Sequence, residues 1–216
     1  MTGPAADLAF VAAGTALCAD AVAGLDEAAF AAPSALPGWT RKHVVAHLAA
    51  NAEALMRLLH WATTGERTPM YASPEQRNAD IAAGALRPGA ELASWFTSSA
   101  ARLDGALAAM PDAAWSNEVV TAQGRTVPAS QVPWMRAREV LVHAVDLATG
   151  VTFADLPADF LARLGAEIRA KREVAGEQVG DLVGTPADVT AYLAGRGTAG
   201  VTTPDGAPAP APSPWL

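Results

Sequence analysis

The sequence has only one cysteine, Cys18, among its 216 residues, so no disulfide can form within the chain. It also has no run of about 18 uninterrupted apolar residues, although 51% of its residues are hydrophobic, and this argues against a membrane-spanning helix. Its first residues, MTGPAADLAFVAAG, lack the basic segment that begins a signal peptide. From these absences we expect a soluble cytoplasmic protein with no membrane partner.

Positive charge is scarce as well. The chain has 15 Lys and Arg residues against 22 Asp and Glu residues, which gives a formal net charge of −7 and a pI near 5.0. No stripe of lysine or arginine stands out, and such a stripe is typical of proteins that bind nucleic acid. We therefore exclude nucleic acid as a partner and expect a monomer that binds small molecules.

What the sequence has in abundance is helical periodicity. Apolar residues recur at spacings of three and four in several long segments, which is the pattern of amphipathic helices. Four long helices are expected, at about residues 5–25, 41–63, 88–110 and 131–149. Thr40 is the candidate N-cap of the second helix, Gly150 is expected to close the fourth, and Gly124 marks the turn of a small hairpin. These helices favour a four-helix bundle.

The character of the chain changes after Gly150. One further helix is expected from Pro157 to about Glu173, followed by a glycine-punctuated stretch, a short helix in TPADVTAYLAGRG and an extended, proline-rich end. The predicted fold is therefore mainly α, with the bundle over residues 1–152 and a small α+β subdomain over residues 153–216.

The fourth helix raises a problem of burial. Its middle, REVLVHAVDL, is apolar nearly all the way round, which is typical of a helix inside a protein. Glu139 and His143 nevertheless share one face of it, and Asp146 follows three residues later on the same side. An unpaired carboxylate in such a place costs on the order of several kcal/mol. Some partner must therefore offset the charge of Glu139.

A divalent metal is one such partner. His47 lies on the inward face of the second helix, so that His47, Glu139 and His143 together predict a metal site of two imidazoles and one carboxylate. Three protein ligands leave positions open on the metal, as catalysis requires. Zinc is the first choice, while manganese, cobalt and nickel fit the same ligands. Asp146 is then placed to orient His143 or a bound water. On spacing alone, a buried Glu–His pair that shares a hydrogen bond is the simpler explanation.

The other histidines and the cysteine are assigned elsewhere. His43 lies in the exposed first turn of the second helix, and His60 projects from the side opposite His47, so both are expected outside the metal site. Cys18 lies on the apolar stripe of the first helix, which predicts a small core side chain. Any thiol chemistry then requires a sulfur from outside the protein.

Over nearly its whole length the sequence resembles the mycothiol-dependent maleylpyruvate isomerases, which belong to the DinB-like family of metal-dependent bundles. The segments that carry the resemblance are GWTRKHVVAHLAANAEALMRLLHWATTGERTPMY, SPEQRNADIAAG, AQGRTVPASQVPWMRAREVLVHAVDL and YLAGRGTAGVTTPDG. The W-T…H-L and R-E…H-A-x-D-L signatures mark the wider family. LHWATTGERTPMY and TAQGRTVPAS are specific to the isomerases.

The resemblance implies roles for individual residues. It makes His47, Glu139 and His143 the metal ligands. It matches Arg196 of AGRG to a functional arginine, expected to be catalytic and to bind the substrate, and Arg77 of QRNADI to an arginine that faces the same cleft. Arginine suits a dianionic substrate because its planar guanidinium binds a carboxylate through two hydrogen bonds.

The implied activity is the cis–trans isomerisation of maleylpyruvate to fumarylpyruvate, a step of gentisate-type aromatic degradation, with mycothiol as thiol cofactor. The thiolate adds to the double bond, the intermediate rotates about the resulting single bond, and the sulfur leaves. Between Lys171 and DVTAYLAGRG the chain is shorter than the family pattern and lacks residues that normally form strands of the C-terminal subdomain. The shortening spares every matched functional residue.

Three other functions fit the same residues. A mycothiol S-transferase would conjugate electrophiles and consume the thiol. A non-haem iron oxygenase also uses two histidines and a carboxylate, although usually on a β-rich fold. A metal-sequestering or ligand-binding bundle would bind metal without turnover of any electrophile.

Overall fold

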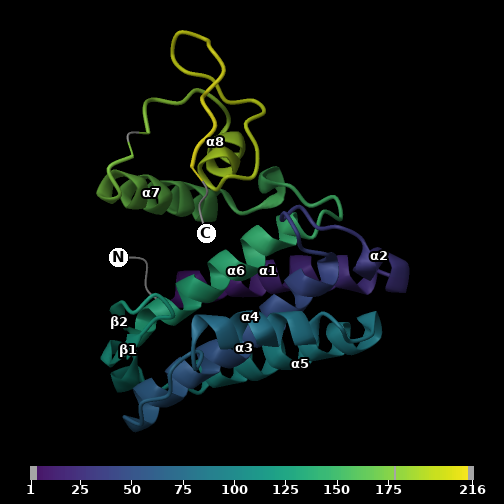
Figure 1. The fold of residues 1–216 in the computed structure, drawn as a ribbon. Helices are drawn as coiled ribbons and strands as arrows, with labels where there is room; N and C mark the ends of the chain where they lie inside the picture. The colour runs from purple at the N-terminus through teal and green to yellow at the C-terminus, as the bar shows by residue number, and fades with distance from the viewer. Residues whose placement is uncertain (1–3, 178, 214–216) are drawn as a thin grey trace. The chain divides into compact units, whose positions relative to one another are not determined.

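The computed structural model describes residues 4–177 and 179–213. The chain divides into two compact units, Met1–Thr149 and Gly150–Leu216, so the boundary falls after Thr149 rather than after the predicted residue 152. The first unit contains α1 (Pro4–Ala23), α2 (Glu27–Ala31), α3 (Arg41–Thr64), α4 (Pro74–Gly84), α5 (Gly89–Ala108), η1 (Asp112–Ser116), β1 (Glu118–Val120), β2 (Thr126–Pro128), η2 (Ala129–Gln131) and α6 (Val132–Asp146) (Figure 1). The second contains η3 (Phe153–Asp155), α7 (Ala158–Val174) and α8 (Pro186–Leu193).

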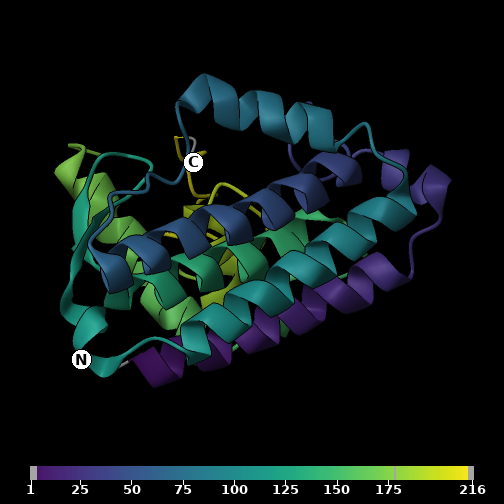
Figure 2. The ribbon, with the colours of Figure 1, turned by 90° about the horizontal axis from the view of Figure 1, so that it is seen from below.

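The four predicted long helices are present as α1, α3, α5 and α6, which confirms the mainly helical fold class. Their packing closes a ring, because α1 contacts α6, α6 contacts α3, α3 contacts α5 and α5 contacts α1. Helix α4 packs against α3 outside this ring, as the view from below shows (Figure 2). The short α2 was not predicted, since five residues are too few to show a helical period.

Local sequence sets the start of α3, whereas a contact from another helix sets the end of α6. Thr40 is the N-cap of α3, as predicted, and His43 completes a capping box there. The predicted end of the fourth helix at Gly150 is wrong: α6 ends at Asp146, and Ala148 takes the left-handed backbone conformation with φ 53°. The reason is tertiary, because Arg41 donates hydrogen bonds to the Leu147 carbonyl at 2.6 Å and to the Ala148 carbonyl at 2.9 Å.

Helix α1 is long and apolar enough, by length and composition alone, to cross a membrane, and it is the one such helix in the described part of the chain. In the structure it is a helix of the bundle. Val11, Cys18 and Val22 of its apolar stripe are buried, and the helix packs on α6 and α5.

Strand pairing is limited in both units. In the first, β1 and β2 form the predicted antiparallel hairpin, with Gly124 at φ 76° in its turn. In the second, the described residues form isolated bridges between Val183 and Thr202 and between Thr202 and Pro208, and no strand. The β component of the predicted α+β subdomain is therefore reduced to these bridges beside α7 and α8.

The close approach of α1 to α6 depends on Gly14. A Cβ atom at this position would lie 2.5 Å from Val140 Cγ2 and 2.8 Å from Leu141 Cγ. We expect Gly14→Ala to lower the free energy of unfolding by roughly 1–3 kcal/mol because the two helices must separate, despite the better helix propensity of alanine. The matched control is Gly105→Ala on α5, where nothing lies within 4 Å and a gain of up to about 1 kcal/mol is expected. Thermal unfolding followed by circular dichroism compares the two variants, and equal effects would contradict the prediction.

Candidate metal centre

Helices α3 and α6 bring three potential metal ligands together. His47 lies in the second turn of α3, while Glu139 and His143 lie one turn apart on α6. Glu139 Oε2 is 2.7 Å from His47 Nε2 and 3.3 Å from His143 Nε2, and one ligand atom of each residue lies within 4.8 Å of the others. Among the described residues this is the one group of three or more His, Cys, Asp and Glu side chains with that geometry.

Each imidazole holds its second ring nitrogen against a neighbouring side chain. His143 Nδ1 is 2.8 Å from Asp146 Oδ2, and because a carboxylate only accepts, this nitrogen carries the proton and leaves Nε2 facing Glu139. Asp146 itself is fully buried. On the other side, Arg77 Nη2 lies 3.4 Å from His47 Nδ1. The arrangement fixes both rings, and Asp146 occupies the position predicted for it relative to His143.

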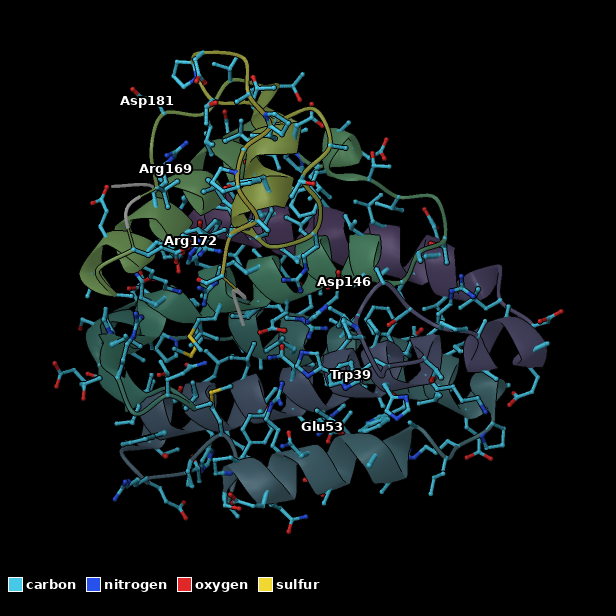
Figure 3. The ribbon with its side chains drawn as sticks, turned by 45° about the horizontal axis from the view of Figure 1, so that its top comes forward. Trp39, Glu53, Asp146, Arg169, Arg172 and Asp181 are labelled. Carbon is cyan, nitrogen blue, oxygen red and sulfur yellow. The ribbon has the colours of Figure 1, made fainter. Side chains whose placement is uncertain are left out.

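The rings are also held by packing. The two imidazoles meet edge to face, with centroids 4.9 Å apart. The Trp39 ring, just before α3, packs 5.8 Å from that of His47. Figure 3 labels Trp39, which packs on His47, and Asp146, which contacts His143.

The electrostatics of the group favour an ionised carboxylate. Burial by itself would raise the pKa of Glu139, but the charges and hydrogen bonds of His47 and His143 outweigh it and hold that pKa well below its usual range. Burial would lower the pKa of His143, yet hydrogen bonds to Asp146 and Glu139 raise it to about 9. For His47, burial dominates and the pKa is lowered. One proton on His143 therefore balances Glu139, and a bound metal ion would have to displace it.

A buried arginine supplies further compensation for Glu139. Arg136 lies one turn earlier on α6, is 1% exposed and donates to the Leu48 carbonyl and to Asn51 Oδ1, both at 2.8 Å. Burial lowers its pKa to about 10, against the raising effect of Cys18 and Glu139, so it remains a cation at neutral pH. The charge of Glu139 is thus offset within the protein.

The donor set fits a divalent ion of the zinc type. Two imidazole nitrogens and one carboxylate oxygen are a common catalytic set, and a carboxylate on the outer nitrogen of a ligating histidine is its usual support. The simpler alternative, a Glu–His pair that only shares a hydrogen bond, accounts for Glu139 and His143. His47 approaches the same oxygen from another helix at 2.7 Å, so the carboxylate has two imidazole partners.

The other two histidines of α3 lie away from the candidate metal centre, and Arg196 lies in the second unit. His43 Nδ1 is 2.8 Å from Thr40 Oγ1 in the capping box, and the exposed His60 lies 3.3 Å from Glu66. Both are outside the group of three ligands, as expected. Arg196 belongs to the second unit, where Gly195 and Gly197 flank it.

The Arg196 backbone N–H donates to the Ala191 carbonyl and that of Gly195 to Tyr192, the hydrogen bonds of a Schellman motif. The glycine-marked end predicted for this helix is confirmed. The Arg196 guanidinium donates from Nη1 to the Ala194 carbonyl at 2.7 Å.

Three residues near the site were not predicted. Two of them are Trp39, which packs on His47, and Arg136, which lies one turn from Glu139. The third, Tyr71, lies in the loop before α4 with the Arg77 guanidinium 5.8 Å from its ring centroid. The only sequence signals were a tryptophan next to the N-cap Thr40 and an arginine inside an otherwise apolar helix.

Cys18 is confirmed as a core residue. It is fully buried, its thiol donates to the Val140 carbonyl at 3.1 Å, and burial raises its pKa to about 12 although Arg136 opposes this. We therefore expect Cys18→Ala to keep thiol-dependent activity within about twofold, because the native side chain is a neutral thiol out of reach of solvent. Iodoacetamide labelling at mildly alkaline pH should modify Cys18 only after unfolding. Rapid labelling of the folded protein, or loss of turnover in a folded Cys18→Ala variant, would show that the protein supplies its own nucleophile.

Comparisons with known proteins decide the family. A family model described as the mycothiol maleylpyruvate isomerase N-terminal domain matches residues 11–148. The chain belongs to the mycothiol-dependent maleylpyruvate isomerase family. A solved structure described as the crystal structure of the mycothiol-dependent maleylpyruvate isomerase is 42% identical, with a TM-score of 0.94 over 100% of both chains. A search of curated proteins returned no match.

A second solved isomerase structure, of a histidine-to-alanine variant, is 41% identical with a TM-score of 0.93, again over 100% of both chains. The likeness of this chain to the isomerases therefore extends beyond the matched N-terminal domain to the C-terminal unit.

Proposed function

We propose that this protein is a mycothiol-dependent isomerase that converts maleylpyruvate to fumarylpyruvate, as part of gentisate-type aromatic degradation. The observation that carries the proposal is its full-length likeness to a solved enzyme of that description at 42% identity. The convergence of His47, Glu139 and His143 supports it, because that group offers the open metal site such chemistry uses.

In this proposal the three converging side chains hold a divalent metal, with zinc the first choice. The bound metal supplies Lewis acidity, which lowers the pKa of a thiol and polarises a carbonyl oxygen. Asp146 keeps the proton of His143 on Nδ1 and so leaves Nε2 available for ligation. Arg77, at the edge of the site, and Arg196 pair with the carboxylates of the substrate.

The reaction itself is balanced without any oxidant or reductant. The sulfur of mycothiol forms a bond to one alkene carbon, and the electron pair of the double bond moves onto the conjugated carbonyl as an enolate. Rotation about the new single bond follows. The electron pair then returns, the carbon–sulfur bond breaks and the thiolate is regenerated.

The deciding experiment is an assay of purified protein with maleylpyruvate, with and without mycothiol. Fumarylpyruvate should form only when mycothiol is present, and a catalytic amount should suffice. Stoichiometric consumption of mycothiol would instead identify an S-transferase, the second candidate. Oxygen consumption would indicate an oxygenase, and metal binding without turnover of any electrophile would indicate a sequestering protein.

We further propose that the enzyme acts as a cytoplasmic monomer. The support is the acidic composition, without a stripe of lysine or arginine, and the packing of the apolar α1 within the bundle. Light scattering of the purified protein tests its oligomeric state, and a stable dimer would contradict it.

A further inference from the structure

A pocket of about 250 Å³ lies between α3, α4 and α5. Its polar and aromatic lining consists of Glu53, Arg57, Tyr71, Asp80, Arg87 and Trp95, named here the α3–α4 pocket. Ala50, which also lines it, is one helical turn from His47 on α3, and Asp80 is one turn from Arg77 on α4. Residues three apart on a helix share a face, so Ala50 and Asp80 lie on the same helix faces as His47 and Arg77.

Tyr71 connects the pocket with Arg77, the arginine that contacts His47. It lines the pocket, and the Arg77 guanidinium, which contacts His47, covers its ring. Burial and the negative charge of Glu139 both raise the pKa of Tyr71. The loop that carries Tyr71 is fixed by Arg57, whose Nη1 donates to the Met70 carbonyl at 3.0 Å.

The lining has balanced charge. Two carboxylates, Glu53 and Asp80, face the same space as two guanidinium groups, Arg57 and Arg87. A dianion such as maleylpyruvate would gain from the arginines but be repelled by the carboxylates. A neutral ligand with many hydroxyl groups suits all four, because each hydroxyl donates to a carboxylate and accepts from a guanidinium.

The indole ring of Trp95 forms one wall of the pocket and is held in a fixed position. Its Nε1 donates to Glu53 at 3.0 Å, and the Arg87 guanidinium stacks 4.3 Å from its ring centroid. A Cβ atom at Gly84 would lie 2.9 Å from the Trp95 ring, so the ring is also packed against α4. Figure 3 labels Glu53, the α3 residue that accepts the hydrogen bond from Trp95. Flat apolar rings with a few fixed polar groups are typical of small-molecule sites.

We propose that the α3–α4 pocket binds the glucosaminyl-inositol part of mycothiol and directs its cysteine thiol toward His47, Glu139 and His143. The inference rests on the proposed function for the identity of the thiol. The distance is suitable, since His47 and Ala54 are about 10 Å apart along α3 at about 1.5 Å per residue. A cysteinyl arm attached to two six-membered rings spans such a length.

Steady-state kinetics of the full chain test this assignment. Asp80→Ala removes an exposed carboxylate of the pocket, and Trp95→Leu removes its ring wall. Asp80→Ala should raise the KM for mycothiol roughly tenfold, the effect of losing one hydrogen bond to a charged group. Trp95→Leu should raise it by a similar factor, because the ligand loses the ring against which it packs. Their kcat at saturating mycothiol and their KM for maleylpyruvate should stay within about twofold, and inhibition by N-acetylglucosaminyl-inositol, which keeps the neutral amide of mycothiol, should weaken in parallel. The matched control is Trp61→Leu, a second tryptophan with an arginine, Arg67, 5.9 Å from its ring centroid but outside the pocket.

The outcomes separate the pocket from the reaction. An unchanged KM for mycothiol in Asp80→Ala and Trp95→Leu, or a rise in the KM for maleylpyruvate instead, would overturn the assignment. If the unaltered protein does not turn over maleylpyruvate, the proposed function fails. Calorimetric titration with mycothiol then decides the pocket on its own, because weaker binding by Asp80→Ala than by Trp61→Leu supports it and equal binding refutes it.

Discussion

Glu139→Ala is expected to purify without stoichiometric metal and to lose at least roughly a thousandfold in turnover of maleylpyruvate, since the Lewis acid that activates the thiol is lost. Glu139 contributes the one oxygen that approaches both imidazoles. His47→Ala and His143→Ala should behave in the same way. Elemental analysis of the purified variants, beside a maleylpyruvate assay, measures both effects.

Two further variants make this result specific. His60→Ala changes an exposed histidine of α3 outside the site and should keep both metal and activity. Asp146→Asn keeps the shape of the side chain but removes the charge that holds His143 Nδ1, so metal affinity should fall roughly 10–100-fold without vanishing. A Glu139→Ala protein with full metal content would contradict the proposal that these three residues bind the metal.

Arg196→Lys is expected to lower kcat/KM for maleylpyruvate roughly 10–100-fold, because lysine keeps the charge but cannot form two parallel hydrogen bonds to a carboxylate. Arg196→Ala should lower it further. Metal content should stay unchanged in both, since none of the proposed ligands is altered. This follows from the match of AGRG to a functional arginine of the family.

A structural effect must be separated from this one. The Arg196 side chain donates to the Ala194 carbonyl at the end of α8, so its loss also weakens that helix end. Arg169→Ala is the control in the same unit: Arg169, labelled in Figure 3, donates to the Gly180 carbonyl at 3.4 Å. Thermal unfolding is measured for Arg196→Ala and Arg169→Ala alike. Arg169→Ala should turn over maleylpyruvate normally. Normal turnover by Arg196→Ala would contradict the role proposed for this arginine.

The sequence by itself determined the helices and the convergence of His47, Glu139 and His143. The periods that define α1, α3, α5 and α6 are local, because each helix must turn its apolar face inward to be stable. The i, i+4 spacing of Glu139 and His143 places them on one face whatever surrounds the helix. His47 lies on the inward face of α3, and inward side chains on facing helices of a bundle lie near one another.

Only the tertiary structure decided which other groups surround them. Tyr71 joins the site from a loop, and Arg136 is held one turn from Glu139 because Leu48 and Asn51 of α3 accept its hydrogen bonds. None of these contacts has a spacing rule, since each joins segments far apart in the chain.

The end of α6 shows the same division. Its sequence favours a stop at Gly150, where glycine tolerates a left-handed backbone. Arg41, from the start of α3, instead binds the carbonyls of Leu147 and Ala148, and the helix ends at Asp146 with an alanine in the left-handed conformation. Hydrogen bonds from a distant guanidinium outweigh the local cost of about 1–2 kcal/mol, which only the packed bundle makes possible.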